Sequence, residues 1–221
     1  MFEHHKKESP IISLLGMGGG VGSYAFIRRG VDGYEIARSL RFNSADSAYL
    51  SRTPGSAGNR KTWTWAGWVK RSKLGTEQVI WTAGADTNSG EWSALRFYPT
   101  TDQLQFINNT SNSTDINLLT TQVFRDASAW YHVLLRADIS NATANDRIDI
   151  YINGTKVDAY STQTQPATTV NTGINGAQIH NIGREAARAN YYCDLYLADV
   201  HFIDGQALTP SSFGEFDENN V

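Results

Sequence analysis

Apolar and polar residues alternate in short runs along most of the chain, beginning near residue 39. Period-two alternation bounded by turn-forming residues is typical of β-strands, and helical periodicity is almost absent. Such a series of strands around one core predicts an all-β fold, an antiparallel β-sandwich or jelly roll. The expected strands cover residues 39–42, 62–70, 78–82, 94–98, 103–107, 130–137, 147–152, 156–160, 178–182 and 194–203.

Turn chemistry supports antiparallel pairing. Asn153-Gly154 lies between two alternating runs, and a two-residue type I′ turn requires positive φ at both central positions. A second hairpin is expected around Pro99–Asp102. The polar stretches 108–117 and 161–176 are predicted to be surface loops, and Thr209 before Pro210 predicts a capped final turn.

The chain before residue 39 has a different character. Residues 1–10 are polar, whereas residues 11–27 are apolar and rich in glycine. Glu3 and Glu8 argue against a signal peptide, and the glycines fit no phosphate-loop pattern. Glycine permits close backbone approach, so we predict an extended arm that contacts other subunits, with folding back on its own domain as the alternative. The expected contact residues are Ile11, Leu14, Leu15, Gly18, Gly19, Gly20, Tyr24 and Phe26.

These patterns divide the chain into three parts. Residues 1–38 form the predicted anchoring arm, residues 39–216 the sandwich and residues 217–221 a C-terminal tail. Hydrophobic residues make up 40% of the chain, enough for a sizeable core.

Charge and composition exclude several classes of function. The net charge of −3 argues against nucleic-acid binding, and no apolar run is long enough to insert into a membrane. The charge is uneven, since residues 1–80 carry 12 Lys and Arg against 6 Asp and Glu, whereas residues 81–221 carry 7 against 16. This difference predicts either internal complementarity or docking of the basic front part.

Candidate catalytic groups are missing. Glycoside hydrolysis needs two carboxylates about 5–10 Å apart, and no strand carries the E-x-D-x-E pattern that would supply them. No G-x-S-x-G elbow occurs. The single cysteine, Cys193, adjoins Asp194, which would raise its thiol pKa and disfavour a nucleophile. We therefore predict no catalytic residues and a protein that is not an enzyme.

Ligand-binding signals are weaker but present. Asp86 and Asn88 are weak calcium candidates, and no other metal or cofactor is expected. Sugar binding would use aromatic faces with polar neighbours, for which Trp92, Glu91, Trp81 and Tyr98 are the candidates. Trp92, beside a glycine-containing turn, is the best candidate for an exposed ring, although packing against the core is the simpler alternative. Four other tryptophans match interior positions of a sandwich: Trp63, Trp65, Trp68 and Trp130.

Several segments, in order, resemble concanavalin A-like, laminin G-like sandwich domains. The resemblance covers about residues 39–216 and implies a jelly-roll fold with the arm in front of it. The segments are Ser39–Leu50, Trp63-Thr-Trp-Ala-Gly-Trp-Val-Lys70, Trp130-Tyr-His-Val133, Ile150-Tyr-Ile-Asn-Gly-Thr-Lys-Val157, Ile179-His-Asn-Ile-Gly-Arg184 and Leu197–Thr209.

Three stretches, residues 39–50, 53–71 and 197–219, also look like virion proteins of marine bacteriophages. That resemblance implies a non-enzymatic structural part of the particle: a tail fibre, a head fibre or a capsid decoration. The implied partners are other virion proteins, copies of the same chain in a symmetric homo-oligomer such as a trimer, and host-surface glycans. The alternatives are a carbohydrate-binding receptor module and, less favoured, a glycan-cleaving enzyme.

Overall fold

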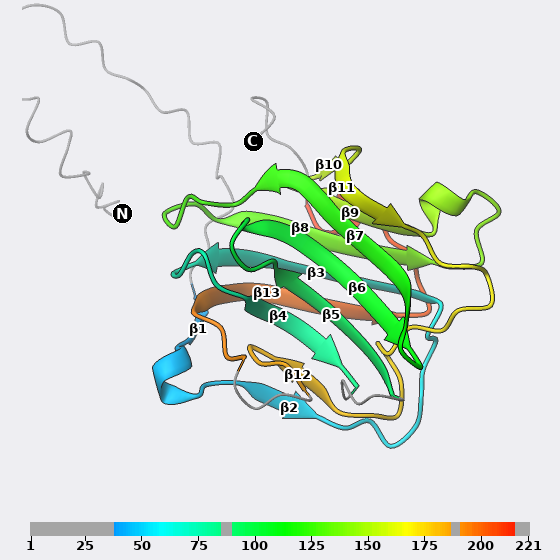
Figure 1. The fold of residues 1–221 in the computed structure, drawn as a ribbon, viewed down its shortest axis with the longest axis horizontal. Helices are drawn as coiled ribbons and strands as arrows, with labels where there is room; N and C mark the ends of the chain where they lie inside the picture. Colours follow the sequence, from blue (N-terminus) through cyan, green and yellow to red (C-terminus); the bar gives the residue numbers. More distant parts are fainter. Residues whose placement is uncertain (1–37, 85–89, 187–190, 215–221) are drawn as a thin grey trace, which may run out of the picture. The chain divides into compact units, whose positions relative to one another are not determined.

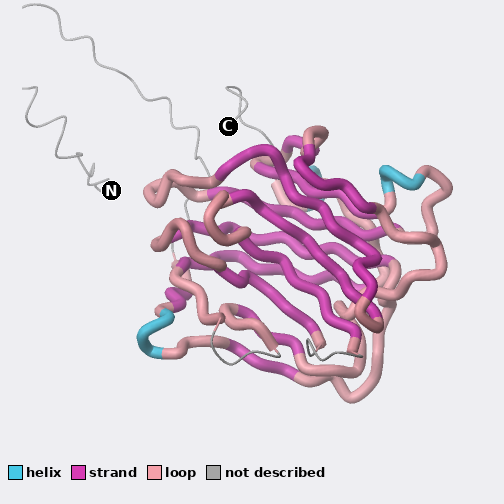
Figure 2. The backbone as a smooth tube through the Cα atoms, in the orientation of Figure 1, coloured by secondary structure: helices cyan, strands magenta, loops and turns pink. Residues whose placement is uncertain are grey.

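The computed structural model describes residues 38–84, 90–186 and 191–214, which belong to one compact unit. Two antiparallel sheets pack face to face, and the helical content of these residues is limited to short 3-10 turns (Figures 1 and 2). The predicted sandwich is therefore confirmed. The predicted arm residues lie outside the described residues.

Each sheet combines runs of consecutive strands with strands that are distant in sequence. The six-stranded sheet has the order β1 (Leu40–Phe42), β13 (Leu195–Asp204), β3 (Thr62–Arg71), β8 (Tyr131–Asp138), β9 (Ile148–Ile152) and β10 (Thr155–Lys156). The seven-stranded sheet has the order β11 (Tyr160–Thr164), β7 (Ser113–Val123), β6 (Gln103–Thr110), β5 (Glu91–Phe97), β4 (Gln78–Ala83), β12 (His180–Ile182) and β2 (Leu50–Arg52). Three 3-10 turns complete the described elements: η1 (Ser44–Asp46), η2 (Ala144–Asp146) and η3 (Pro210–Ser212).

The turn between β9 and β10 confirms the prediction made for Asn153-Gly154. Both residues have positive φ, 48° and 77°, and Ile152 pairs directly with Thr155. The prediction of a loop over residues 108–117 is wrong, because most of that stretch belongs to the β6–β7 hairpin. Its turn, Ser111-Asn112, also has positive φ at both positions, but the dipeptide lacks the glycine that would have marked it.

The prediction of a loop over residues 161–176 holds for residues 165–176 but is wrong for residues 161–164, which belong to β11. β11 pairs with β7 at the edge of the seven-stranded sheet, and its sequence Tyr-Ser-Thr-Gln-Thr is polar on both sides. An edge strand with little apolar surface has no alternation to detect.

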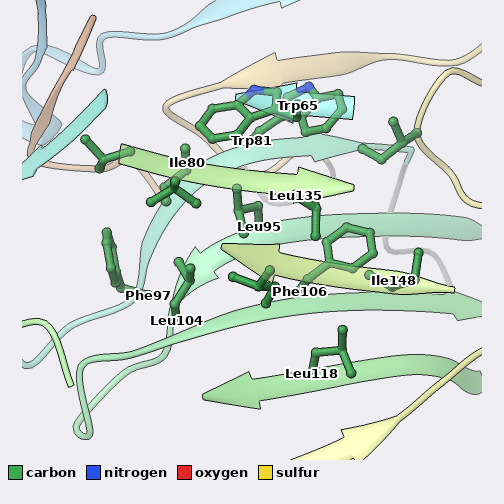
Figure 3. Packing of buried hydrophobic residues seen from close by; sticks show 14 of the residues in the cluster. Trp65, Ile80, Trp81, Leu95, Phe97, Leu104, Phe106, Leu118, Leu135 and Ile148 are labelled. Carbon is green, nitrogen blue, oxygen red and sulfur yellow. The ribbon is translucent and has the colours of Figure 1, made fainter. Parts of the chain in front are cut away.

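Apolar side chains fill the space between the sheets. Figure 3 shows Trp65 beside Trp81, with Leu95, Phe106 and Leu135 farther inside. Each of these last three is fully buried. Close packing of large rings in this interlayer is the main source of stability expected for such a sandwich.

Two of the tryptophans predicted for the interior do not lie there. Trp68 is half-buried, and its ring contacts His132, the residue opposite it on β8, with centroids 5.2 Å apart. Strand alternation places it on the opposite face from Trp63 and Trp65. Trp130, just before β8, is also only half-buried.

One end of the sandwich is closed by a buried ion pair. Arg71, at the end of β3, is fully buried and donates to an Asp102 carboxylate oxygen at 2.8 Å and to the Phe124 carbonyl at 2.5 Å. The same Asp102 oxygen accepts from the Gly75 N–H at 2.8 Å. The pair thus joins β3, the turn before β6 and the segment after β7.

Candidate functional site

Along one side of the sandwich, a groove of about 610 Å³ opens between the sheets. β1 pairs only with Leu195–Leu197, so it covers only the beginning of β13. The groove is lined by residues of the remainder of β13 and of the β12–β2 edge of the other sheet. Figure 1 shows where these strands lie. It is lined by Leu50, Ser51, Arg52, Pro54, Ser56, Ala57, Gly58, Trp65, Trp81, Asn175, His180, Ile182, Val200, Phe202 and Asp204.

Strand register brings one wall of the groove together. Residues directly opposite each other in an antiparallel pair project to the same face. Leu50 is opposite Ile182, and Ile182 is opposite Trp81, which gives an apolar row across β2, β12 and β4. Arg52 is opposite His180 on the same face, so a polar row lies beside the apolar one.

A β-bulge in β13 supplies the other wall. The pairing with β3 shifts by one residue between Ala198 and His201, where Asp199 has a φ of 46°. Such a bulge reverses the faces of all later residues. After it, Phe202 is opposite Trp65 and Asp204 is opposite Trp63, so both side chains point between the sheets.

Aromatic rings form the floor and rim of the groove. The ring centroids of Trp81 and Phe202 are 5.3 Å apart, and the Trp81 and Trp65 rings stack at 6.3 Å with an interplanar angle of 20°. Trp81 is only 6% exposed, whereas Phe202 is 40% and Leu50 50% exposed. A ligand would therefore meet Phe202 and Leu50 first, with Trp81 beneath them.

One hydrogen-bond donor in the floor of the groove has no partner among the described residues. This donor is the buried indole nitrogen of Trp65. In Figure 3 it lies on the same side as the indole nitrogen of Trp81, away from Leu95 and Phe106. A buried N–H without an acceptor is uncommon and costs free energy.

Polar groups close one end of the groove. One oxygen of Asp204 accepts from the Asn59 N–H at 2.8 Å and from the Asn175 side-chain amide at 2.7 Å. The Asn175 N–H donates to Nε2 of His180 at 3.0 Å, and His180 Nδ1 lies 2.8 Å from the Gln178 carbonyl. Accepting at Nε2 requires a neutral ring with its proton on Nδ1.

The surroundings of His180 favour this neutral state. Burial lowers the pKa of His180, the hydrogen bond to the Gln178 carbonyl opposes this effect, and the nearby Arg52 charge adds to the lowering. At neutral pH the imidazole is therefore an uncharged link that holds the loop around Asn175 against β12.

The structure separates the four predicted sugar-binding residues. Trp81 lines the groove. Trp92 and Tyr98 lie elsewhere, one on each side of the Arg96 guanidinium, which is 5.8 Å from either ring centroid. Glu91 forms an ion pair with Arg60. Of the two alternatives given for Trp92, packing holds and exposure does not, because the ring is only 8% exposed and packs with two other apolar side chains.

Arg96 explains why Trp92 is covered. Its guanidinium forms an ion pair with Glu77 and donates to the Gln105 side chain at 2.8 Å. These cross-strand contacts hold the arginine between the two aromatic rings on the face of β5 that is turned away from Leu95 and Phe97. Trp92 and Tyr98 are thus brought together, but not with Trp81.

Sequence reasoning missed most of the groove. Arg52, His180 and Phe202 were not among the predicted site residues, and each depends on long-range pairing. Nothing in the sequence marks the bulge at Asp199, and regular alternation would have turned Phe202 outward. The detectable signal was the unusual number of aromatic residues shared by the two strands that carry Trp65 and Trp81.

The described lining of the groove offers few groups for acid–base or nucleophilic chemistry. Asp204 is the one carboxylate among its described lining residues, and protein donors already engage it. Cys193 is fully buried outside the groove, and burial together with Asp194 raises the pKa of its thiol. Both features agree with the prediction that this cysteine is not an activated nucleophile.

Metal binding receives no new support from the described residues. None of their His, Cys, Asp and Glu side chains form a group of three or more suited to hold a metal ion. Asp86 and Asn88 lie outside the described residues, so the calcium site stays a prediction. Within residues 38–84, 90–186 and 191–214, no helix has the length and apolar character needed to span a membrane.

Comparison with solved structures identifies the fold. Mouse laminin α1 domains LG4-5 are 11% identical, with a TM-score of 0.54 over 80% of this chain and 44% of that chain. This chain thus spans less than half of the laminin fragment. A heptameric SAP-like pentraxin from Limulus polyphemus is 15% identical, with a TM-score of 0.47 over 74% of this chain and 72% of its own.

Sequence comparison gives a more decisive result. No curated protein sequence matches the chain. Residues 43–212, however, match the profile of the concanavalin A-like lectin/glucanases superfamily, a range that contains nearly all of the strands described above. The chain therefore belongs to the concanavalin A-like lectin/glucanases superfamily.

Proposed function

We propose that the protein is a non-enzymatic virion component whose sandwich binds a glycan in the groove between β13 and β2. The observation that carries the glycan-binding part is the half-exposed Phe202 ring above the buried Trp81 in an open groove. Pockets of this kind, apolar with a few placed polar groups, are typical small-ligand sites.

Both the apolar part and the polar part of the groove suit a sugar ring. The C–H face of a pyranose packs on an aromatic ring, and Phe202 offers such a ring at the rim. Hydroxyl groups need donors and acceptors nearby, which Asn175, Arg52 and Asp204 supply along the same groove. An aromatic surface next to polar side chains serves a ligand that is itself apolar on one face and polar at its edges.

A binding role is favoured over glycan cleavage by the carboxylates. Hydrolysis needs an acid and a second carboxylate on either side of the scissile bond. Among the described residues lining the groove only Asp204 carries a carboxylate, and two donors hold it. We accordingly expect the chain to bind glycans without releasing products from them.

A glycan array probed with the full chain tests the binding proposal. We expect a small set of related glycans to be retained, and Phe202→Ala to abolish that retention. Val123→Ala is the matched control, because Val123 is also an exposed apolar residue, 44% exposed, but lies on β7 outside the groove. Retention that survives Phe202→Ala would contradict this assignment of the site.

The virion part of the proposal is supported by the resemblance of residues 39–50, 53–71 and 197–219 to marine phage virion proteins. Mass spectrometry of purified phage particles is expected to detect the chain.

We further propose that the arm drives self-association. Replacing both Leu14 and Leu15 by Asp should then lower the mass measured by light scattering to that of a monomer. An unchanged oligomer, or a monomeric starting protein, would contradict the anchoring role.

A further inference from the structure

An arginine without an acidic partner stands at the polar row of the groove. Arg52 ends β2, directly opposite His180, and its side chain projects to the groove face. It is exposed, and it forms no ion pair with any described carboxylate. Arginines elsewhere in the fold, such as Arg71 and Arg96, do have acidic partners.

The other ionisable groups of the groove, His180 and Asp204, form no ion pair with Arg52. His180 is held neutral by the hydrogen bond that its Nε2 accepts from the Asn175 N–H. One oxygen of Asp204 is occupied by the Asn59 N–H and the Asn175 amide, and its other oxygen faces Gly58. The groove therefore presents a cation at one wall and a carboxylate already engaged at its end.

The apolar and charged rows lie next to each other. Leu50 and Arg52 are two residues apart on the same face of β2, so their side chains follow one another along the groove. Phe202, from β13, lines the same groove. Residues two apart on a strand lie about 7 Å apart, so a sugar ring beside Leu50 has the Arg52 position within one repeat along β2.

We infer that the glycan bound in the groove is acidic, with its ring on Phe202 and a carboxylate or sulfate on the Arg52 guanidinium. This inference rests on the proposed glycan binding and adds the ligand class. Guanidinium and carboxylate or sulfate oxygens form paired, charge-assisted hydrogen bonds, which are stronger than neutral ones. An uncharged sugar would offer Arg52 only neutral hydroxyl acceptors.

The competing explanation for Arg52 is protection of an edge strand. Charged side chains on a short edge strand discourage pairing with other chains, and β2 is the last strand of its sheet. This explanation predicts that Arg52 affects self-association and not ligand choice. Replacing Arg52 should therefore change ligand preference under the first explanation and self-association under the second.

Titration calorimetry of the full chain with matched oligosaccharides separates them. The probes are an oligogalacturonate, its fully methyl-esterified neutral form and a sulfated galactan oligomer. We expect the acidic probes to bind at least about tenfold more tightly than the ester, and Arg52→Gln to remove that difference by weakening acid binding far more than ester binding. Arg41→Gln is the matched control, since Arg41 is exposed on β1 and does not line the groove.

The outcomes distinguish failure of the acidic ligand class from failure of the glycan site. If the ester and the acids bind equally and Arg52→Gln changes nothing, the acidic class is wrong while glycan binding stands. If Phe202→Ala leaves binding of every probe unchanged, or no probe binds, the glycan site itself is wrong and this inference falls with it. Tighter binding of the galacturonate would identify the acidic group on Arg52 as a carboxylate, and tighter binding of the sulfated probe would identify it as a sulfate. Binding that Arg52→Lys retains in full would overturn the paired geometry, because lysine keeps the charge but not the planar fork.

Discussion

Two regions of the sandwich place charged and aromatic side chains in opposite environments. One is the end closed by Arg71 and Asp102, and the other is the groove lined by Trp81 and Phe202. At the closed end a cation is fully buried and its charge is met by a carboxylate and carbonyls. In the groove an aromatic ring is 40% exposed and a cation has no acidic partner among the described residues. The first arrangement completes the fold internally, whereas the second leaves exposed groups that we propose a ligand covers.

The largest expected effect is at the closed end. Asp102→Asn removes the charge that compensates Arg71 in a buried site, and breaking such a pair costs about 3–5 kcal/mol of the free energy of unfolding. Denaturant titration measures it. Arg125→Gln is the control, because Arg125 contacts the same carboxylate at 3.2 Å but its side chain is 59% exposed, so the loss should stay below about 1 kcal/mol. Equal losses for both variants would refute the distinction.

The pair also predicts acid sensitivity. Burial alone would raise the pKa of Asp102, but the Gly75 N–H and the Arg71 guanidinium outweigh it and lower that pKa. A lowered folded-state pKa gives stability that is present above the unfolded value, about 3.9, and is lost as pH falls through the folded value. The Asp102→Asn variant should lack this part of the acid transition.

Removal of two phenylalanines compares the buried and exposed parts of the aromatic core. Phe106→Ala empties a fully buried position and should cost about 3–5 kcal/mol. Phe202→Ala should cost only about 1–2 kcal/mol, because its ring is 40% exposed, yet it should abolish glycan binding. Thermal unfolding measures the first comparison, and the array the second. A larger destabilisation from Phe202→Ala would mean that the ring is structural.

A smaller effect is expected from pH on the groove. The folded-state pKa of His180 is lowered, so the unfolded chain binds a proton more readily, and stability should fall as pH drops below about 6.5 towards the folded value. His180→Gln should reduce that slope. His132 has a pKa lowered by burial and by the His201 charge, so His132→Gln gives the matching contribution from outside the groove. A slope unchanged by His180→Gln would contradict the neutral link to Asn175.

The smallest effect concerns the lone thiol. Because burial and Asp194 raise the pKa of Cys193, we expect no measurable alkylation by iodoacetamide at pH 8 in the folded protein and rapid reaction after unfolding. Mass spectrometry after timed quenching measures both. Rapid modification of the folded chain would contradict the buried position.

The fold could be predicted from sequence because its longer strands repeat apolar residues with period two. The prediction failed where strands are polar at an edge, as in β11, or where a turn lacks glycine, as at Ser111-Asn112. The two failures have different causes. β11 is stabilised by pairing with β7, which is distant in sequence, whereas the β6–β7 hairpin is local but its turn lacks the glycine that would mark it.

The candidate site was less predictable. Trp81 was found from its aromatic character alone, but Trp92 shares that character and is covered because Arg96 lies against it. Phe202 faces the groove only because of the bulge at Asp199, and Arg52 only because β2 pairs with β12. Residue type thus suggested the kind of chemistry, whereas register decided which residues supply it.

The most direct test of the groove uses the indole N–H resonances of five of the six tryptophans in ¹⁵N-labelled full chain, titrated with the acidic oligosaccharide. Trp65 and Trp81 line the groove, whereas Trp92, Trp68 and Trp130 do not. We predict shifts for Trp65 and Trp81 that saturate with the ligand, while the signals of the other three stay in place. Saturable shifts confined to Trp92, with Trp65 and Trp81 unmoved, would contradict the account and move the site to the face that carries Arg96.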